Sequence, residues 1–472
     1  MTKTENRTLD ELSVGDEATI TRVCTDDDFY VFANVSGNHN PMHLADIDGD
    51  GDGQSEAVAP SMWVGSLISA VLGNVLPGAG TLYNSQSLKF LGHAHAGDEL
   101  QIRVVVRSKQ PSGEVTFGTS VTRIGDGAVI VDGEAVVTAP KVKLRFENLY
   151  VPGLIVQRHR HFERLLARAE PLDPMPTAVV APEDAASLGG ALLARKHTII
   201  EPILVGDPGK IRQAAEEIGA DLAGLDIAEA TTPEAAAQLG VQLVATDRAH
   251  AIMKGHLHTD DLLHAVLRRE SGLRTGRRLT HVFVMDVPGV PHPLLVTDAA
   301  INIAPDLKTK MAIVQNAIDL ARAIGIEEPN VGVLSAVETV NPDIPSSVDA
   351  ALLAKMADRG QIHGGKVDGP LAMDNAVDLK AARIKGISSQ VAGNAQILVV
   401  PNLDAGNMLA KQLTYVSKAT GAGIVMGAKC PIILTSRADD DKARLSSCAV
   451  AVLQATFARQ VGKKPKADGQ PL

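Results

Sequence analysis

The sequence has few cysteines and no long apolar run. Its three cysteines, Cys24, Cys430 and Cys448, are too few and too scattered for a disulfide framework, and none lies in a CxxC pair. We therefore expect a reducing compartment, the cytoplasm. Residues 1–15 are polar and acidic, and no later segment offers about 18 uninterrupted apolar residues, so we expect neither export nor a membrane span.

Two common nucleotide-binding patterns are also missing. The chain has no Walker lysine loop and no GxGxxG after a strand, which argues against nucleotide hydrolysis and hydride transfer. Lys and Arg number 45 against 55 Asp and Glu, and the net charge of -10 argues against a non-specific nucleic-acid binder while allowing a local basic pocket. The remaining composition is ordinary for a globular protein, and 472 residues suffice for two or three domains of roughly 150 residues each.

The chain has two regions with different patterns, and we place the boundary near residue 155. In the first region, a nearly uncharged segment at residues 61–76 predicts a buried helix. The alternating segments that follow predict an antiparallel meander around this helix, with strands at 86–91, 99–107, 115–124 and 128–139.

In the second region, short aliphatic strands alternate with helical periods. The strand expected at 198–205, followed by a helix from Pro208, is one example. This alternation predicts an α/β domain with a largely parallel sheet. Because the region is longer than one compact domain usually is, we expect two subdomains that flank a cleft.

The most informative motif of the first region is Val-Ser-Gly-Asn-His-Asn-Pro-Met-His at residues 35–43. It resembles the Ser-Gly-Asp-x-Asn-Pro-x-His motif of the (R)-specific enoyl-CoA hydratases of the MaoC-like hotdog family. The resemblance implies that residues 1–150 form an α+β hotdog domain that binds acyl-CoA. It also implies that His43 is the family histidine, that Ser61 offers its backbone N–H to the thioester carbonyl at the start of the central helix, and that Ser66 lies near the thioester.

Asn38 occupies the position of the family's catalytic aspartate. A carboxamide has no useful basicity, so this residue cannot take a proton from the attacking water as an aspartate does. Loss of a positioned base typically costs a factor of about 10² to 10⁴ in rate, and His43 is the available substitute. Hydration, acyl-CoA binding without hydration, and a purely structural turn at residues 38–41 are the alternatives that the sequence leaves open.

Two groups of residues suggest metal sites without supporting one. Residues 46–52 imitate the beginning of an EF-hand loop, but the twelfth position is Ala57, which offers no carboxylate. A solvated acidic loop is therefore favoured over weak calcium binding. His256, His258 and His264 lack a clear carboxylate or fourth ligand, which argues against zinc.

Several segments of the second region resemble, in order, the phosphate acetyltransferase and phosphate butyryltransferase family. They are Leu-Val-Gly-Asp-Pro at 204–208, Met-Lys-Gly at 253–255, Gly-Leu-Arg-Thr-Gly at 272–276, Thr-Asp-Ala-Ala-Ile-Asn at 297–302, Val-Asp-Gly-Pro-Leu at 367–371, Pro-Asn-Leu-Asp-Ala-Gly-Asn at 401–407 and Leu-Thr-Ser-Arg at 434–437. The resemblance covers about residues 158–465 and implies an α/β phosphotransacylase domain with two isocitrate-dehydrogenase-like subdomains and a cleft. It implies reversible transfer of an acyl group between coenzyme A and inorganic phosphate, with no cofactor beyond these substrates.

The same resemblance implies roles for individual residues. Arg437 would clamp phosphate or the developing thiolate, with Ser436 donating a hydrogen bond. Asn302 and Asn407, just past strand ends, would bind carbonyl or phosphate oxygens. The acidic run Asp439–Asp441 would include the base that deprotonates the thiol of coenzyme A.

One departure from that family concerns the positive charge near phosphate. Acetyl-specific relatives have an arginine where this chain has His264, and Lys254, Arg274 or Arg277 would have to replace it. Asp298 and Asp374 are equally well interpreted as helix caps or buried acceptors and as catalysts.

These observations favour a two-part acyl-CoA enzyme, a hotdog domain fused to a phosphotransacylase. One alternative is an (R)-specific enoyl-CoA hydratase with a degenerate transferase domain. Another is a hotdog module that only binds acyl-CoA or dimerises. Because hotdog sheets often pair across a two-fold axis, we expect a homo-oligomer formed through both domains, with neither nucleic acid nor membrane as a partner.

Overall fold

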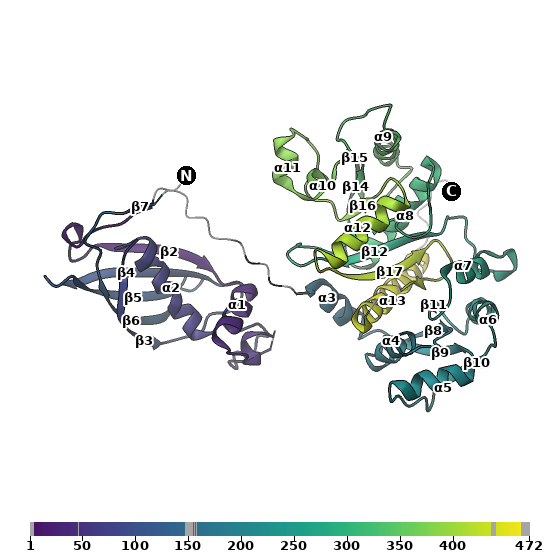
Figure 1. The fold of residues 1–472 in the computed structure, drawn as a ribbon, viewed down its shortest axis with the longest axis horizontal. Coiled ribbons are helices and arrows are strands. Elements are labelled where there is room, and N and C mark those ends of the chain that lie inside the picture. Colours follow the sequence, from purple (N-terminus) through teal and green to yellow (C-terminus); the bar gives the residue numbers. More distant parts are fainter. Residues whose placement is uncertain are drawn as a thin grey trace. The chain divides into compact units, whose positions relative to one another are not determined.

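The computed structural model describes residues 4–45, 47–146, 154, 156, 158–435 and 440–463. The chain divides into two compact units, residues 1–156 and 157–472 (Figure 1). The expected functional limits, 1–150 and 158–465, stay predictions. Ser436, Arg437 and Asp439 lie outside the described residues.

The first unit is a five-stranded antiparallel sheet with the order β2-β4-β5-β6-β3. The strands are β2 (Glu17–Val23), β3 (Leu82–Phe90), β4 (Glu99–Lys109), β5 (Glu114–Arg123) and β6 (Val129–Thr138). Helix α2 (Ser61–Asn74) packs on this sheet, and α1 (Asp26–Ser36) and the short helices η1 (Leu9–Glu11) and η2 (Pro41–His43) precede it (Figure 1). The short strands β1 (Thr4–Glu5) and β7 (Arg145–Phe146) pair separately.

Helix α2 carries mostly apolar side chains, and the sheet buries it along most of its length. Trp63, Val64 and Ile68 belong to the core, and the Trp63 ring meets Phe29 of α1 edge-on at 5.3 Å. At Gly65 the helix comes so close to β3 that an added Cβ would lie 2.8 Å from a methyl group of Leu88. The sequence-based expectation of a buried central helix is confirmed.

The expected simple meander is wrong in its strand order. Strands β4, β5 and β6 do follow one another, but β3 pairs with β6, and β2, which we did not predict, pairs with β4. Turn residues predict hairpins between consecutive strands, whereas pairing between distant strands has no local signal. The residues of β2 are mostly exposed, so the strand lacks the apolar alternation that identifies a half-buried strand.

The second unit is built on an eleven-stranded sheet with the order β10-β9-β8-β11-β18-β17-β12-β13-β16-β14-β15. The strands are β8 (Met175–Val180), β9 (Ile200–Gly206), β10 (Asp226–Glu229), β11 (Ala251–Lys254), β12 (Thr280–Asp286), β13 (Leu294–Thr297), β14 (Asn330–Leu334), β15 (Lys366–Leu371), β16 (Ile397–Val399), β17 (Thr420–Met426) and β18 (Ile432–Ile433). Most neighbouring pairs are parallel, as the sequence predicts for an α/β domain.

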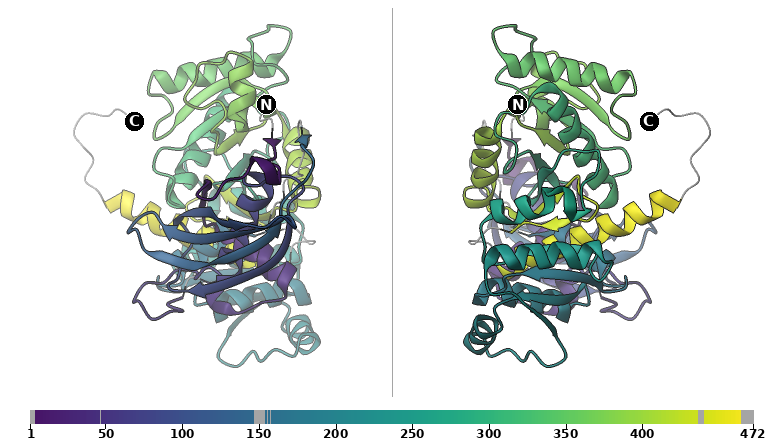
Figure 2. Two further views of the ribbon diagram at one scale, coloured as in Figure 1. Left: turned by 90° about the vertical axis from the view of Figure 1, so that its left-hand side faces the viewer. Right: turned by 90° about the vertical axis from the view of Figure 1, so that its right-hand side faces the viewer.

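Helices cover both faces of this sheet. One core contains residues of α3 (Arg160–Ala169), α4 (Ala185–Lys196), α5 (Pro208–Glu217), α8 (Leu307–Ala323), α9 (Pro345–Asp358) and α13 (Asp441–Lys463). A second core contains α6 (Pro233–Ala245) and α7 (Thr259–Leu267), and a third contains α10 (Met373–Val377), α11 (Leu379–Ile384) and α12 (Leu403–Tyr415). Helix α13, yellow in Figure 2, packs along β17.

Three antiparallel pairs in the middle of the sheet decide where functional loops lie. Strand β17 runs against both β18 and β12, and β12 runs against β13. Strands β13, β16, β14 and β15 therefore point opposite to β8, β9, β11 and β18. The carboxyl ends of the two groups lie at opposite edges of the sheet, where an edge is the line along which the strands begin or end.

Strand β17 accounts for this reversal and was missed by the sequence analysis. The expected helix over residues 404–420 ends at Tyr415, and the chain turns through Lys418, which has φ of 59°, before the strand begins. The segment Thr-Gly-Ala-Gly-Ile-Val-Met contains two glycines, which weaken a strand signal.

No helix in the described ranges is long and apolar enough to cross a membrane. The three cysteines are buried and unpaired. Burial raises the pKa of each thiol to about 12.

Candidate functional site

In the first unit, the motif loop connects α1 to η2. Helix α1 ends at Gly37, which adopts φ of 74°, a conformation that suits glycine. Asn38 is exposed, and its side-chain oxygen accepts a hydrogen bond from the backbone N–H of Asn40 at 3.2 Å. Asn40 in turn accepts from the N–H of Met42 at 3.3 Å. Asn38 therefore stabilises a local turn with the atom that would be a carboxylate oxygen in an aspartate.

His43 is held beside the start of the central helix. Its Nδ1 lies 2.7 Å from the carbonyl oxygen of Val58, three residues before Ser61. Because a carbonyl only accepts, Nδ1 carries a proton in this contact. Three residues span at most about 10 Å, so His43 and the first residue of α2 belong to the same small region.

The amino end of α2 has backbone donors that no capping side chain occupies. Its N-cap is Pro60, which makes no side-chain cap, and Ser61 is the first helical residue. Such a helix end attracts partial negative charge. Ser66 is exposed, and its hydroxyl donates to the carbonyl of Trp63 at 2.6 Å, so it is bound to its own helix.

The acidic loop departs in part from the expected solvated loop. The Asp50 side chain is only 9% exposed, and its carboxylate lies 3.0 Å from Nε2 of His95. The hydrogen bond from His95 lowers the pKa of Asp50. Asp48 accepts the N–H of Gly51 at 2.8 Å. These two carboxylates thus fold the loop, and Asp50 forms a potential ligand group with Asp52 and His95.

In the second unit, a cavity of about 350 Å³ lies at the edge where β8, β11 and β18 end. Lys254, the last residue of β11, lines it and is only 6% exposed. The next residue, Gly255, donates to the carbonyl of Val180, and an added Cβ would lie 2.3 Å from the carbonyl oxygen of Ala181. This close approach fixes the strand end and with it the direction of Lys254.

A second buried cation lines the same cavity, and the sequence analysis did not predict it. Arg444 of α13 is 3% exposed, and its Nη1 donates to Oγ1 of Thr435 at 3.0 Å. Helix α4 accommodates it at Gly190, where an added Cβ would lie 2.4 Å from Cδ of Arg444. Thr435 directly precedes Ser436 and Arg437. A lone arginine in a helix normally predicts a surface residue, so only the tertiary structure reveals this one.

Two acidic candidates that follow Arg437 lie at the start of α13. Asp440 accepts the N–H of Ala443 at 2.8 Å and so caps the helix, and Asp441 is its first residue. Asp184 and His256 also line the 350 Å³ cavity, and their nearest charged atoms are 3.9 Å apart.

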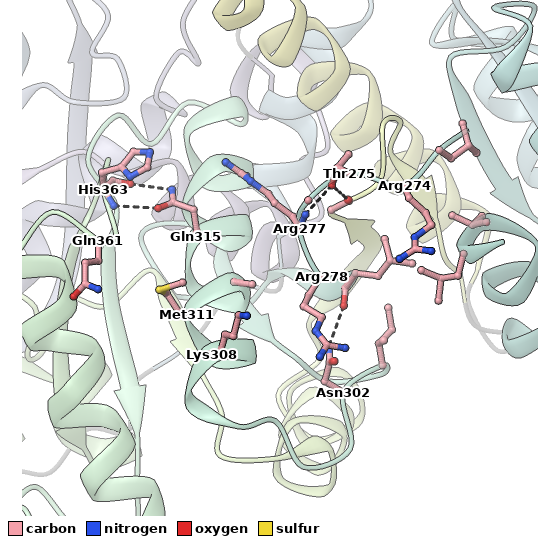
Figure 3. Close-up of a pocket in the computed structure, with 18 residues that line it drawn as sticks. Arg274, Thr275, Arg277, Arg278, Asn302, Lys308, Met311, Gln315, Gln361 and His363 are labelled. Carbon is pink, nitrogen blue, oxygen red and sulfur yellow. Dashed lines mark hydrogen bonds between the residues drawn. The ribbon is translucent and has the colours of Figure 1, made fainter. Parts of the chain in front are cut away.

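A larger cavity, of about 580 Å³, lies at the opposite edge of the sheet (Figure 3). Asn302 lines it beside Arg274, Arg278 and Lys308. The side-chain amide of Asn302 donates to Asp298 at 2.6 Å and to the carbonyl of Leu279 at 3.0 Å. Its amide nitrogen is therefore engaged within the protein, and its side-chain oxygen is the atom left for a ligand.

Asp298 is a buried acceptor that shapes this turn. It is 2% exposed and also accepts the N–H groups of Ala300 and Ile301 at 3.0 Å each. The neighbouring His281 is 1% exposed, and burial lowers its pKa to about 4, although the charge of Asp298 acts in the opposite direction.

The remaining predicted residues lie apart from these cavities. Asn407 is half-buried in α12, next to Gly406, which packs against the backbone of Asp298, and it lines neither described cavity. His264 is exposed in the last turn of α7. Asp374 is exposed and lies 3.3 Å from Lys385.

Within the described residues, no group of three ligating side chains includes His256, His258 or His264. The structure thus brings Lys254, Arg444 and Thr435 together at one edge and leaves Asn302 at the other.

Comparison with known proteins divides the chain in the same order. Residues 228–452 match the family described as "Phosphate acetyl/butaryl transferase", and residues 8–125 match "MaoC like domain". A phosphate acetyltransferase of Rhizobium meliloti is 56% identical over 298 residues, which cover 63% of this chain and 94% of that protein. A phosphate butyryltransferase of Clostridium beijerinckii is 42% identical over 296 residues, covering 63% and 98%.

A solved structure gives the same result for the second unit. The crystal structure of a branched-chain phosphotransacylase from Enterococcus faecalis V583 is 32% identical, with a TM-score of 0.53, and covers 60% of this chain and 99% of that one. The expected order, a MaoC-like domain followed by a phosphotransacylase domain, is confirmed.

Proposed function

Because the chain belongs to the phosphate acetyl/butyryl transferase family, we propose that it moves an acyl group reversibly between coenzyme A and inorganic phosphate. In this reaction a phosphate oxygen attacks the thioester carbonyl, a C–O bond forms as the C–S bond breaks, and the products are an acyl phosphate and coenzyme A. The thiolate that leaves takes up one proton.

The observation that carries this proposal is the pair of buried cations, Lys254 and Arg444, in one cavity at a strand edge. Phosphate is bound by fixed cations and N–H donors, and buried cations act on it with little screening by water. Ser436 and Arg437 directly follow Thr435 in the sequence. In this proposal Arg437 binds the phosphate or the developing thiolate, and Ser436 donates a hydrogen bond. One of the residues Asp439–Asp441 is the base that deprotonates the thiol of coenzyme A in the reverse direction.

The first unit supports a second, weaker role. We propose that residues 1–150 bind an acyl-CoA thioester at the amino end of α2, with His43 beside it, and hydrate enoyl-CoA poorly because Asn38 cannot act as a base. Ser61 would donate its N–H to the carbonyl, and Ser66 would lie near the thioester. The transferase domain would occupy residues 158–465.

Several properties of the whole molecule accompany this proposal. We expect a cytoplasmic homo-oligomer that needs no cofactor besides its substrates. Asn302 and Asn407 are proposed to bind oxygen atoms of a substrate. The alternative of a hydratase with a degenerate transferase domain is not favoured, because the second unit aligns with phosphate acetyltransferases over nearly their whole length.

Phosphate-dependent release of coenzyme A tests the transferase directly. Acetyl-, propionyl- and butyryl-CoA are each incubated with the purified chain, with and without phosphate. The free thiol of released coenzyme A is measured with a colorimetric thiol reagent. We expect release that requires phosphate and that ranks the three acyl chains. Absence of release with all three substrates, from folded protein, would remove the transferase assignment.

A further inference from the structure

The 580 Å³ cavity carries a concentration of positive charge separate from the buried cations Lys254 and Arg444. Four basic side chains line it, from the loop after η3 (Arg269–Ser271) and from the first turn of α8: Arg274, Arg277, Arg278 and Lys308. No Asp or Glu is among its lining residues in the described part of the chain. In a protein with a net charge of -10, such a cluster is a local exception.

Three of these cations have no carboxylate within ion-pairing distance among the described residues. Arg277 pairs with Asp319 and turns toward α8, away from the others (Figure 3). In the described ranges, Arg274, Arg278 and Lys308 form no ion pair. The charges of Arg278 and Lys308 are felt by Asp306, whose pKa is lowered first by its hydrogen bond with Thr309. Asp306 is occupied as the N-cap of α8.

The rest of the lining suits an organic ligand rather than a bare anion. The apolar side chains include Val266, Leu267, Leu273, Leu279, Ile301 and Met311, and the amides are Asn302, Gln315 and Gln361. The amide of Gln315 is engaged with Asp319 and His363, which leaves Asn302 and Gln361 to meet a ligand. A volume of about 580 Å³ lies within the usual range for small-molecule sites.

The position of this cavity separates it from the proposed site of phosphate attack. It opens where β12 begins and where β13 and β17 end, whereas Lys254 and Thr435 lie at the carboxyl ends of β11 and β18. Because the two groups of strand ends lie at opposite edges, a group bound here is not the phosphate that attacks at Lys254.

We propose that this cavity binds the phosphates of an organic di- or triphosphate, with Arg274, Arg278 and Lys308 around them and the apolar floor under the organic part. Two sources share this chemistry, the phosphorylated adenosine end of coenzyme A and a free nucleotide that acts as an effector. Recognition of this kind needs neither a Walker lysine loop nor nucleotide hydrolysis.

Calorimetric titration of the full chain tests the proposal without relying on turnover. The probes are ADP, adenosine 3′,5′-bisphosphate, coenzyme A and pyrophosphate, applied to the wild type and to Arg278→Gln, Lys308→Gln and the double variant. We expect each single variant to weaken binding of at least one adenosine ligand roughly tenfold, and the double variant roughly a hundredfold. Arg212→Gln, an exposed residue of α5, is the matched control and should bind as the wild type does.

The outcomes distinguish the two sources. If the variants lose binding of adenosine bisphosphate and coenzyme A in parallel, and only the KM for acyl-CoA rises, the cavity binds the adenosine end of coenzyme A. Weakened binding of ADP that does not compete with coenzyme A identifies an effector site. Equal affinity for pyrophosphate and the adenosine ligands, unchanged binding in a folded double variant, or no binding of ADP and adenosine 3′,5′-bisphosphate to the wild type at millimolar ligand would overturn the proposal. The last result leaves the transferase assignment intact if phosphate-dependent turnover persists.

Discussion

The two units keep different parts of the chemistry that their relatives imply. The first unit, which matches a MaoC-like domain, has His43 beside the open amino end of α2, and Asn38 stands where we expect the family's proton acceptor. The second unit has two buried cations at one edge of its sheet, Lys254 and Arg444. Proton transfer depends on the basicity of a single atom and is lost with one substitution, whereas anion binding is shared among several groups.

The largest effect should follow from removing the cation at the centre of the transferase assignment. Arg437→Ala should lower kcat for phosphate-dependent release of coenzyme A by at least about 10²–10³, because a fixed charge that stabilises the transition state is lost. Circular dichroism and thermal unfolding should match the wild type. Near-normal turnover in this variant would place the reaction elsewhere, and Arg212→Ala serves as the exposed control.

A gain of function is the sharpest test of the first unit. Asn38→Asp keeps the side-chain oxygen that accepts from Asn40 and adds a base, so hydration of crotonyl-CoA should rise about a hundredfold. The second substitution His43→Gln should remove most of that gain, and Asn34→Asp on the exposed side of α1 should produce none. If Asn38→Asp gives no increase, the unit lacks more than its base.

A more moderate loss is expected at the buried lysine. Lys254→Met keeps much of the side-chain volume and removes its charge, so kcat/KM for phosphate should fall roughly 10- to 100-fold, as expected for one charge-assisted hydrogen bond. Initial rates at varied phosphate measure this effect. Lys196→Met, an exposed substitution at the end of α4, should change nothing. An equal effect of both substitutions would mean that the local charge of the cavity is unimportant.

A change in pH should act on stability through His281. Its pKa falls from an ordinary 6.5 to about 4 in the folded chain, and its Nδ1 has no hydrogen-bond partner within the described residues. Between these two values the unfolded chain binds a proton that the folded chain does not, so the free energy of unfolding decreases as pH falls. Thermal unfolding at several pH values should show this decrease, and the dependence of stability on pH should be weaker in His281→Gln. His256→Gln, at an exposed histidine, should leave the slope unchanged.

The smallest effect should be at the cysteines. Burial raises the pKa of Cys24, Cys430 and Cys448 to about 12, so almost no thiolate is present near neutral pH. The native protein should react slowly with a thiol reagent, and the unfolded protein should titrate three thiols. Fast reaction of the native chain would contradict the buried positions and would also interfere with the thiol assay.

Local patterns predicted the elements better than their arrangement. The helix expected at 306–324 is Leu307–Ala323, and the strand expected at 99–107 is Glu99–Lys109. Periodicity and capping residues act within a few residues of each other, so they can be recognised in sequence. The reversal of direction at β17 depends on contacts between distant strands, and no local pattern encodes it.

The site residues follow the same rule. Lys254 and Thr435 meet because β11 and β18 are parallel neighbours, which strand-end reasoning anticipates. Asn302 follows β13, whose direction is set by antiparallel pairing with β12, and so it lies at the other edge. Arg444 was missed because its burial comes from the close approach of α4 at Gly190.

The most direct test of the account compares the two activities in one preparation. Two rates are measured at equal enzyme and substrate concentrations. The first is the release of coenzyme A from acetyl-CoA in the presence of phosphate. The second is the hydration of crotonyl-CoA, monitored as the loss of enoyl absorbance. We expect phosphate-dependent release to be at least about a hundredfold faster than hydration. Hydration as fast as release would show that Asn38 does not silence the first unit and would contradict the division of chemistry between the two units.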